Sequence, residues 1–131
     1  MKKVILITGA SSGFGKIIAE KLSNNGNIVF GTSRNPKKYP KPNNYKLIKF
    51  DITSFDDSKL MVNSIVNQTG KIDILINNAG IGFTGPIEEI SIDNVKKVFD
   101  TNFIGQIAII QSVLPIMRSN QSGLIINITS I

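Results

Sequence analysis

Short apolar runs alternate along the chain with longer segments whose apolar residues recur at helical spacing. The first run, residues 4–7, contains no polar residue, which is typical of a strand buried on both faces of a sheet. Similar runs predict four further strands, at residues 28–30, 45–52, 72–76 and 124–128. Strands that alternate with helices favour an α/β fold with a parallel sheet and right-handed crossovers.

Helices are predicted between these strands, over residues 15–24, 54–69 and 91–118. Ser54 followed by Asp57 resembles a capping box, with Asp in the place of the usual Glu or Gln. Ser91 is the predicted cap of the last helix, and Pro115 is expected to disturb its final turns. The segment between residues 35 and 44 contains three prolines and is predicted to be a loop.

The composition of the chain excludes several kinds of catalytic and metal-binding site. Hydrophobic residues make up 41% of the 131 residues, which indicates a packed globular fold. Cysteine and histidine are both absent, which excludes disulfides, serine–histidine triads and most zinc sites, so no metal site is predicted. No apolar stretch is long enough to span a bilayer or to form a signal peptide. We therefore predict a soluble cytoplasmic protein with no membrane partner.

The net charge of +6 raises the question of nucleic-acid binding. Six basic residues fall between positions 34 and 49, but no aromatic pattern of a base-stacking surface accompanies them. A solvated, lysine-rich loop is the simpler interpretation, and no nucleic-acid partner is predicted.

The segment TGASSGFG, residues 8–15, places three glycines between the first strand and the first helix. It is not a Walker A loop, because Ala10 stands where the first glycine belongs and Ile17 where Ser or Thr belongs. The spacing Gly-x-Gly-x-x-Gly fails as well, since Ile18 holds the third place. What remains is Gly-x-x-x-Gly-x-Gly.

This spacing suits the pyrophosphate of a dinucleotide. Gly9 can make the sharp exit from the strand, Gly13 leaves room for phosphates, and Gly15 lets the helix pack close to the sheet. The helix N-terminus supplies free N–H groups and the positive end of a dipole. On this motif alone, a glycine-rich turn without a ligand stays open.

Four further motifs follow in order: Asp51-Ile52, Asn77-Asn78-Ala79-Gly80, Asn102, and LIINITS ending at Ser130. With them the chain resembles the short-chain dehydrogenase/reductase family over essentially its full length. The resemblance implies a Rossmann-like doubly wound parallel sheet in the order 3-2-1-4-5, truncated after the fifth strand. Residues 1–131 would then be an NADP-binding Rossmann domain that is incomplete at its C-terminus.

The resemblance also assigns roles to residues. Asn102 and Ser130 fall on two of the family's four catalytic positions. The positions that it implies for cofactor contact are Thr8, Gly9, Ser11, Ser12, Gly13, Phe14, Gly15, Ser33, Arg34, Asp51, Ile52, Asn78, Ala79 and Gly80.

The end of the second strand indicates which nicotinamide cofactor is used. An acidic residue there would bind the ribose 2′-OH and repel a 2′-phosphate, but this chain has Ser33 followed by Arg34. A guanidinium suits a phosphate, and the lysines downstream add positive potential. We therefore predict NADP(H) rather than NAD(H). The alternative for Arg34 is a solvated loop arginine.

The resemblance implies hydride transfer to or from a small carbonyl compound or secondary alcohol. A tyrosine, with a lysine four residues later on a helix, would be the proton donor and would come after Ser130. Tyr45 and Lys49 have this spacing but lie in a predicted strand. Residues four apart are about 13 Å apart on a strand, against roughly 6 Å on a helix, so we reject this pair.

The chain is thus interpreted as the N-terminal portion of a reductase, and the 131-residue chain itself is predicted to be inactive. Two alternatives remain: a non-catalytic NADP(H)-binding module, or an inactive truncated remnant. A homo-oligomer is expected through the helix at residues 95–118 and the exposed edge of the fifth strand.

Overall fold

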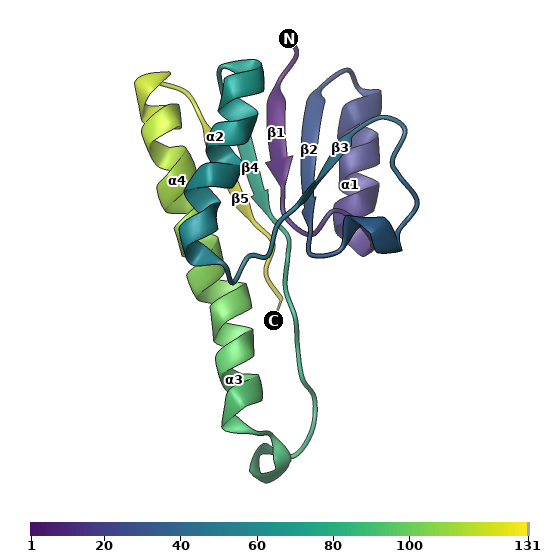
Figure 1. Ribbon diagram of the computed structural model, residues 1–131, viewed down its shortest axis with the longest axis vertical. Coiled ribbons are helices and arrows are strands. Elements are labelled where there is room, and N and C mark those ends of the chain that lie inside the picture. Colours follow the sequence, from purple (N-terminus) through teal and green to yellow (C-terminus); the bar gives the residue numbers. More distant parts are fainter. Residues whose placement is uncertain (131) are drawn as a thin grey trace.

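The computed structural model describes residues 1–130, and its centre is a parallel sheet in the order β3-β2-β1-β4-β5 (Figure 1). The strands are β1 (Val4–Ile7), β2 (Ile28–Ser33), β3 (Lys46–Lys49), β4 (Ile74–Asn77) and β5 (Leu124–Asn127). Helix α1 (Gly13–Asn24) covers one face, and α2 (Ser58–Thr69) and α4 (Gly105–Ser119) cover the other. The predicted doubly wound fold and strand order are confirmed.

The unbroken apolar run of β1 is explained by burial on both faces. Val4 and Leu6 belong to the core layer beneath α2 and α4, whereas Ile5 and Ile7 belong to the layer beneath α1. None of these four side chains is more than 2% exposed. Because each face of a central parallel strand is covered by helices, alternation of polar and apolar residues is lost.

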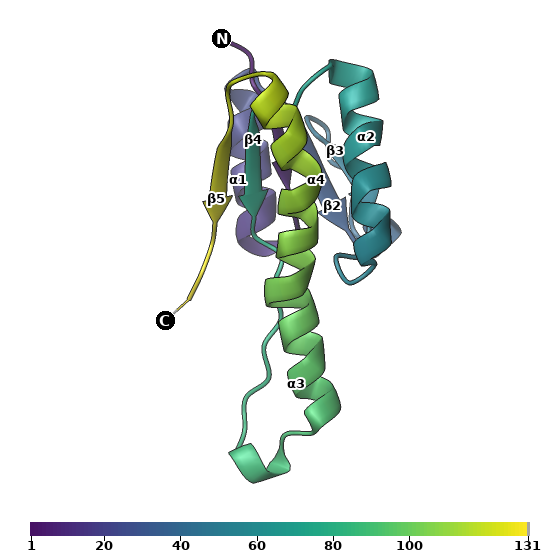
Figure 2. The same cartoon turned by 90° about the vertical axis from the view of Figure 1, so that its left-hand side faces the viewer.

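The predicted third helix is a single rod made of three parts. Helix α3 (Ile92–Phe99) is followed by a π-helical turn (Asp100–Ile104) and then by α4. Ser91 caps α3 as predicted, because its hydroxyl accepts a hydrogen bond from the Asn94 amide at 3.2 Å. Figure 2 shows that α3 carries this rod beyond the end of the sheet.

One local prediction needs correction. Ser54 makes no capping bond through its side chain; a 3₁₀ turn (Phe55–Asp57) precedes α2, and the Asp57 amide closes it on the Ser54 carbonyl at 3.0 Å. Pro115 lies inside α4, which continues to Ser119, close to the predicted end at residue 118. The carbonyl that loses its helical donor there belongs to Gln111, an exposed residue.

Within residues 1–130, no helix has both the length and the apolar character that crossing a bilayer demands.

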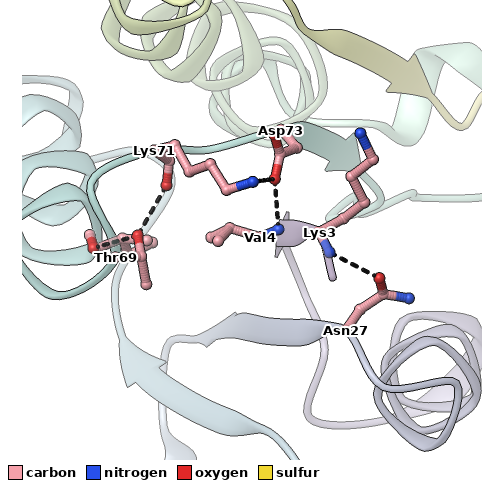
Figure 3. Close-up of polar contacts among 7 residues, drawn as sticks. Lys3, Val4, Asn27, Thr69, Lys71 and Asp73 are labelled. Atoms are coloured by element: carbon pink, nitrogen blue, oxygen red, sulfur yellow. Dashed lines mark hydrogen bonds and ion pairs between the residues drawn. The ribbon is translucent and has the colours of Figure 1, made fainter. Parts of the chain in front are cut away.

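Asp73, directly before β4, ties together three strands at the amino end of the sheet (Figure 3). Its Oδ2 accepts the Val4 amide at 2.8 Å and lies 3.0 Å from the Lys71 ammonium. Its own amide donates to the Val4 carbonyl, and its carbonyl accepts the Leu124 amide of β5. The side chain and the two backbone polar groups of this one residue therefore join the starts of β1, β4 and β5.

We expect this carboxylate to make stability depend on pH in the acid range. Burial alone would raise the pKa of Asp73, but the bonds from Val4 and Lys71 and the charges of Lys71 and Lys3 outweigh it, so the pKa lies below its ordinary value. Because the folded pKa is below the unfolded one, the stabilisation is complete above about pH 4 and is lost as pH falls through the folded value.

The variant Asp73→Asn keeps the shape but not the charge, so it should lose about 1–2 kcal/mol at pH 7 and less at pH 2. Denaturant unfolding between pH 7 and pH 2 measures this difference. Glu88→Gln, at an exposed carboxylate, is the control and should leave the pH profile unchanged. A profile for Asp73→Asn that runs parallel to that of the unaltered protein would contradict the prediction.

Candidate functional site

A cleft of about 590 Å³ lies where β1, β2, β3 and β4 end, including the point between β1 and β4 at which the strand order reverses. Open α/β sheets bind ligands at this switch point. All residues predicted to contact a cofactor line the cleft except Thr8 and Gly15, which lie behind it. The sequence did not single out seven further lining residues: Thr32, Asn35, Lys38, Tyr39, Phe50, Ile81 and Thr101.

The three glycines of the turn have different surroundings. Gly9 has φ +68°, and a Cβ on it would lie 2.9 Å from the Ala79 Cα. A Cβ on Gly15 would collide with the Gly9 carbonyl oxygen and lie 2.5 Å from the Asn78 Nδ2. Gly13 has φ +57° and nothing within 4 Å of its Cβ position, so space is open above it. Gly15 thus allows close packing against the turn itself rather than against a strand.

Hydrogen bonds fix this turn to the ends of the neighbouring strands. The Thr8 hydroxyl accepts the amides of Asn78 and Ala79, both at 3.0 Å. The Asn78 side chain donates to the carbonyls of Thr8 at 3.2 Å and Gly9 at 3.0 Å. On the other side, Thr32 of β2 accepts the Gly9 amide on its hydroxyl and the Ala10 amide on its carbonyl. The turn is therefore rigidly held between β2 and β4.

The N-terminus of α1 opens into the cleft without a protein cap. Ser12 makes no side-chain capping bond, and the first turn contains no acidic residue. Ser12, Gly13 and Phe14 all line the cleft. Unpaired helical N–H groups and the positive dipole end suit a negatively charged ligand at this position.

One wall of the cleft is basic. Arg34 and Lys38 both line it, and a 3₁₀ turn (Pro36–Lys38) brings Lys38 back toward the strand end. Ser33 is 6% exposed, and its hydroxyl accepts the Asn35 amide at 3.3 Å, which fixes the start of this loop. The loop was predicted to be lysine-rich and solvated, with Arg34 at the cofactor, and both Arg34 and Lys38 border the cleft.

Asp51 follows β3, whose end pairs with the end of β2, since the Phe50 amide donates to the Ser33 carbonyl at 2.9 Å. The Asp51 Oδ1 accepts both the amide of Thr53 at 2.9 Å and the Thr53 hydroxyl at 2.7 Å. This local turn fixes the direction in which the chain leaves the sheet, so that Asp51 and Ile52 both reach the cleft.

Asn102 lies in the π-helical turn and binds the loop after β4. Its Oδ1 accepts the Ile81 amide at 2.9 Å, and its Nδ2 donates to the Ile81 carbonyl at 2.7 Å. Next to it, a Cβ on Gly105 would lie 2.6 Å from the Ile52 carbonyl oxygen. Asn102 therefore joins the π-helical turn, through two hydrogen bonds, to the segment of the cleft wall that contains Gly80 and Ile81.

Ser130 follows β5 at the same end of the sheet and is exposed. The pairing of β5 with β4 continues past Asn127, because the Ile128 amide donates to the Asn77 carbonyl at 2.9 Å. The buried Asn77 also donates from its side chain to that of Asn127 at 2.9 Å. These contacts carry the chain to the cleft end of the sheet, although Ser130 is not among the lining residues.

The Tyr45 and Lys49 pair is not arranged for proton transfer to a substrate. Tyr45 is only 7% exposed, and its hydroxyl donates to the Ala10 carbonyl at 2.7 Å, whereas Lys49 is exposed at the end of β3. In the part of the chain that the structure describes, no three His, Cys, Asp or Glu residues gather to hold a metal ion.

Comparison with known proteins agrees with this geometry. A relative named 3-ketodihydrosphingosine reductase, from Bacteroides thetaiotaomicron, is 43% identical over 98% of this chain and 47% of its own length. The solved structure of ElxO with NADP bound has a TM-score of 0.89 at 32% identity, over 99% of this chain and 56% of that one. A short-chain dehydrogenase from Leptospira borgpetersenii with bound NAD⁺ has a TM-score of 0.86 at 29% identity, over 97% and 51%.

The chain thus spans about half the length of the curated relatives that it matches. The family model described as short chain dehydrogenase matches residues 3–131. Together with the strand order and the cleft at the switch point, this match shows that the chain belongs to the short-chain dehydrogenase family.

Proposed function

We propose that this protein binds NADP(H) and takes part in hydride transfer to or from a small carbonyl compound or secondary alcohol. The observation that carries the proposal is that the uncapped N-terminus of α1 and the basic wall at Arg34 border one cleft. A dinucleotide with a 2′-phosphate has negative charge at both places.

The pyrophosphate would lie above the turn of residues 8–15. The open space at Gly13 admits the phosphate oxygens, and the first amides of α1 are donors that no protein cap uses. The Asp51 and Ile52 wall would contact the adenine, and Asn78, Ala79 and Gly80 would border the cofactor further along the cleft.

The choice of NADP(H) rests on this chain's own residues, because relatives with bound NADP and with bound NAD⁺ are both known. The strand end that would carry an acidic residue in an NAD-binding protein has Ser33, and Arg34 follows it at the cleft. Lys38 adds a second cation on the same wall. Both cations favour a phosphate ester over a bare ribose hydroxyl.

When bound, the nicotinamide would supply or accept the hydride. Ser130 is proposed to donate a hydrogen bond from its hydroxyl to the substrate oxygen. Asn102 already uses both polar atoms of its side chain on Ile81, so we propose that it positions the cleft wall rather than transferring a proton through its amide. The name of the 43% identical reductase is consistent with a keto group as the site of reaction.

Self-association is also proposed, because apolar side chains lie exposed on two elements. On the rod, Phe99 is 57% and Phe103 is 59% exposed, and on β5 Leu124 is 51% exposed. Exposed apolar patches of this kind in folded proteins mark interaction surfaces.

The proposal predicts that Arg34→Leu weakens binding of NADPH about 10- to 100-fold and leaves NADH affinity nearly unchanged. The lost interactions are charge-assisted hydrogen bonds to a phosphate that only NADPH carries. Fluorescence titration of both reduced cofactors measures the two affinities. Lys41→Leu, in the same loop but outside the cleft lining, is the control and should change neither. Equal or tighter binding of NADH by the unaltered protein would refute NADP(H) preference.

A further inference from the structure

The side chain of Tyr45 is buried beneath the glycine turn, in the core layer between the sheet and α1. Its hydroxyl donates to the carbonyl of Ala10, which is 35 residues earlier in the chain, at 2.7 Å. Gly31 of β2 provides the room for this contact. A Cβ there would lie 2.5 Å from the Ala10 Cβ and 3.3 Å from the Tyr45 Cε2.

Side-chain donors bind three successive carbonyl groups of the turn. The Asn78 amide binds the carbonyls of Thr8 and Gly9, and the Tyr45 hydroxyl binds that of Ala10. These oxygens are thereby held by the protein, so that they do not face an anion in the cleft, where a carbonyl dipole would repel a phosphate.

The Ala10 carbonyl shares its peptide unit with the amide of Ser11. This unit is planar and trans, so the two groups point in opposite directions. Ser11 lines the cleft, and no acceptor among residues 1–130 is paired with its amide. The hydrogen bond that fixes the Ala10 carbonyl therefore also fixes the direction of the Ser11 N–H, which lies on the cleft side of the same peptide unit.

We propose that Tyr45 is a positioning residue for the pyrophosphate, because its hydrogen bond to Ala10 keeps the Ser11 N–H directed at the anion. This inference rests on the proposed function, since it requires a pyrophosphate in the cleft. Without the hydroxyl, the buried Ala10 carbonyl loses its partner. The peptide then gains by rotating its oxygen toward the cleft, where water can bind it.

The phenol suits this role because it remains a donor throughout the neutral range. Burial, and secondarily the negative charge of Glu20, raises the pKa of Tyr45 above its ordinary value. The phenol therefore keeps the proton that it donates to the Ala10 carbonyl across the neutral range.

The variant Tyr45→Phe tests the proposal, because it keeps the packed ring and removes only the hydroxyl. Two ligands are titrated: NADPH, and adenosine 2′-monophosphate, which has the adenosine and the 2′-phosphate but no pyrophosphate. We expect the affinity for NADPH to fall about 3- to 10-fold. The affinity for adenosine 2′-monophosphate, measured by competition, should stay within about twofold, because the donor lost belongs to the pyrophosphate site.

Thr69→Val is the matched control for a merely structural loss. It removes a hydroxyl whose single proton is shared between the carbonyls of Ile65 at 2.9 Å and Lys71 at 2.8 Å, at the amino end of the sheet (Figure 3). Neither ligand should bind this variant differently. Unchanged NADPH affinity in Tyr45→Phe, or an equal loss for both ligands, would overturn the inference. Absence of NADPH binding by the unaltered protein would instead overturn the proposed function itself.

Discussion

The Thr8→Val variant is expected to lose about 2–4 kcal/mol of unfolding free energy, although valine and threonine have nearly the same shape. Thr8 is fully buried, and its hydroxyl accepts the amides of Asn78 and Ala79 at 3.0 Å each. Valine would leave two backbone N–H groups without an acceptor. Each such group costs about 1–3 kcal/mol when it is buried, and both are only partly exposed here.

Denaturant unfolding measures this loss, and Thr8→Ser is its control. Serine keeps the hydroxyl and removes one methyl group, so a loss of about 1 kcal/mol is expected. The order of stability should therefore be threonine, serine, valine. If Thr8→Val proved as stable as Thr8→Ser, the hydroxyl would not be the group that joins the turn to the end of β4.

The apolar pattern predicted all five strands, and it gave the ends of β1 correctly but misplaced those of the other four. Residues 45–52 were predicted as the third strand, whereas β3 covers only Lys46–Lys49. Tyr45, Phe50 and Ile52 are buried by side-chain packing outside the paired segment. A hydrophobic run indicates which residues are buried, and the buried residues extend beyond those that form hydrogen bonds between paired strands.

The residues of the candidate site likewise include some that the sequence predicted and some that it did not. The glycines of the site and the residues after β4 form continuous motifs, so the sequence located them. Lys38 and Tyr39 line the cleft only because a 3₁₀ turn folds back after Pro36, and no motif encodes that path. The bond from Tyr45 to Ala10 joins residues 35 positions apart and depends on the pairing of three strands. Tertiary contacts of this kind leave no local pattern in the sequence.

The Gly15→Ala variant is expected to abolish cofactor binding, with an affinity loss of at least about 100-fold, and to cost about 3 kcal/mol of stability. The added Cβ would collide with the Gly9 carbonyl oxygen and lie 2.5 Å from the Asn78 Nδ2. Neither atom can yield alone, because Asn78 donates to that same carbonyl at 3.0 Å. Helix α1 must therefore move away from the turn, and its N-terminal amides move with it.

The Gly13→Ala variant distinguishes a loss of NADPH affinity caused by steric blocking of the site from a loss caused by unfolding. Gly13 has φ +57° but nothing within 4 Å of its Cβ position, so alanine should cost only about 1 kcal/mol of backbone strain. Its methyl group would enter the space proposed for the phosphates and weaken NADPH binding nonetheless. Gly82→Ala has neither a strained φ nor a close neighbour and should change neither property. Thermal unfolding and NADPH titration of the Gly15→Ala, Gly13→Ala and Gly82→Ala variants measure the two properties. A Gly13→Ala protein that binds NADPH as tightly as the unaltered protein would show that the pyrophosphate lies elsewhere.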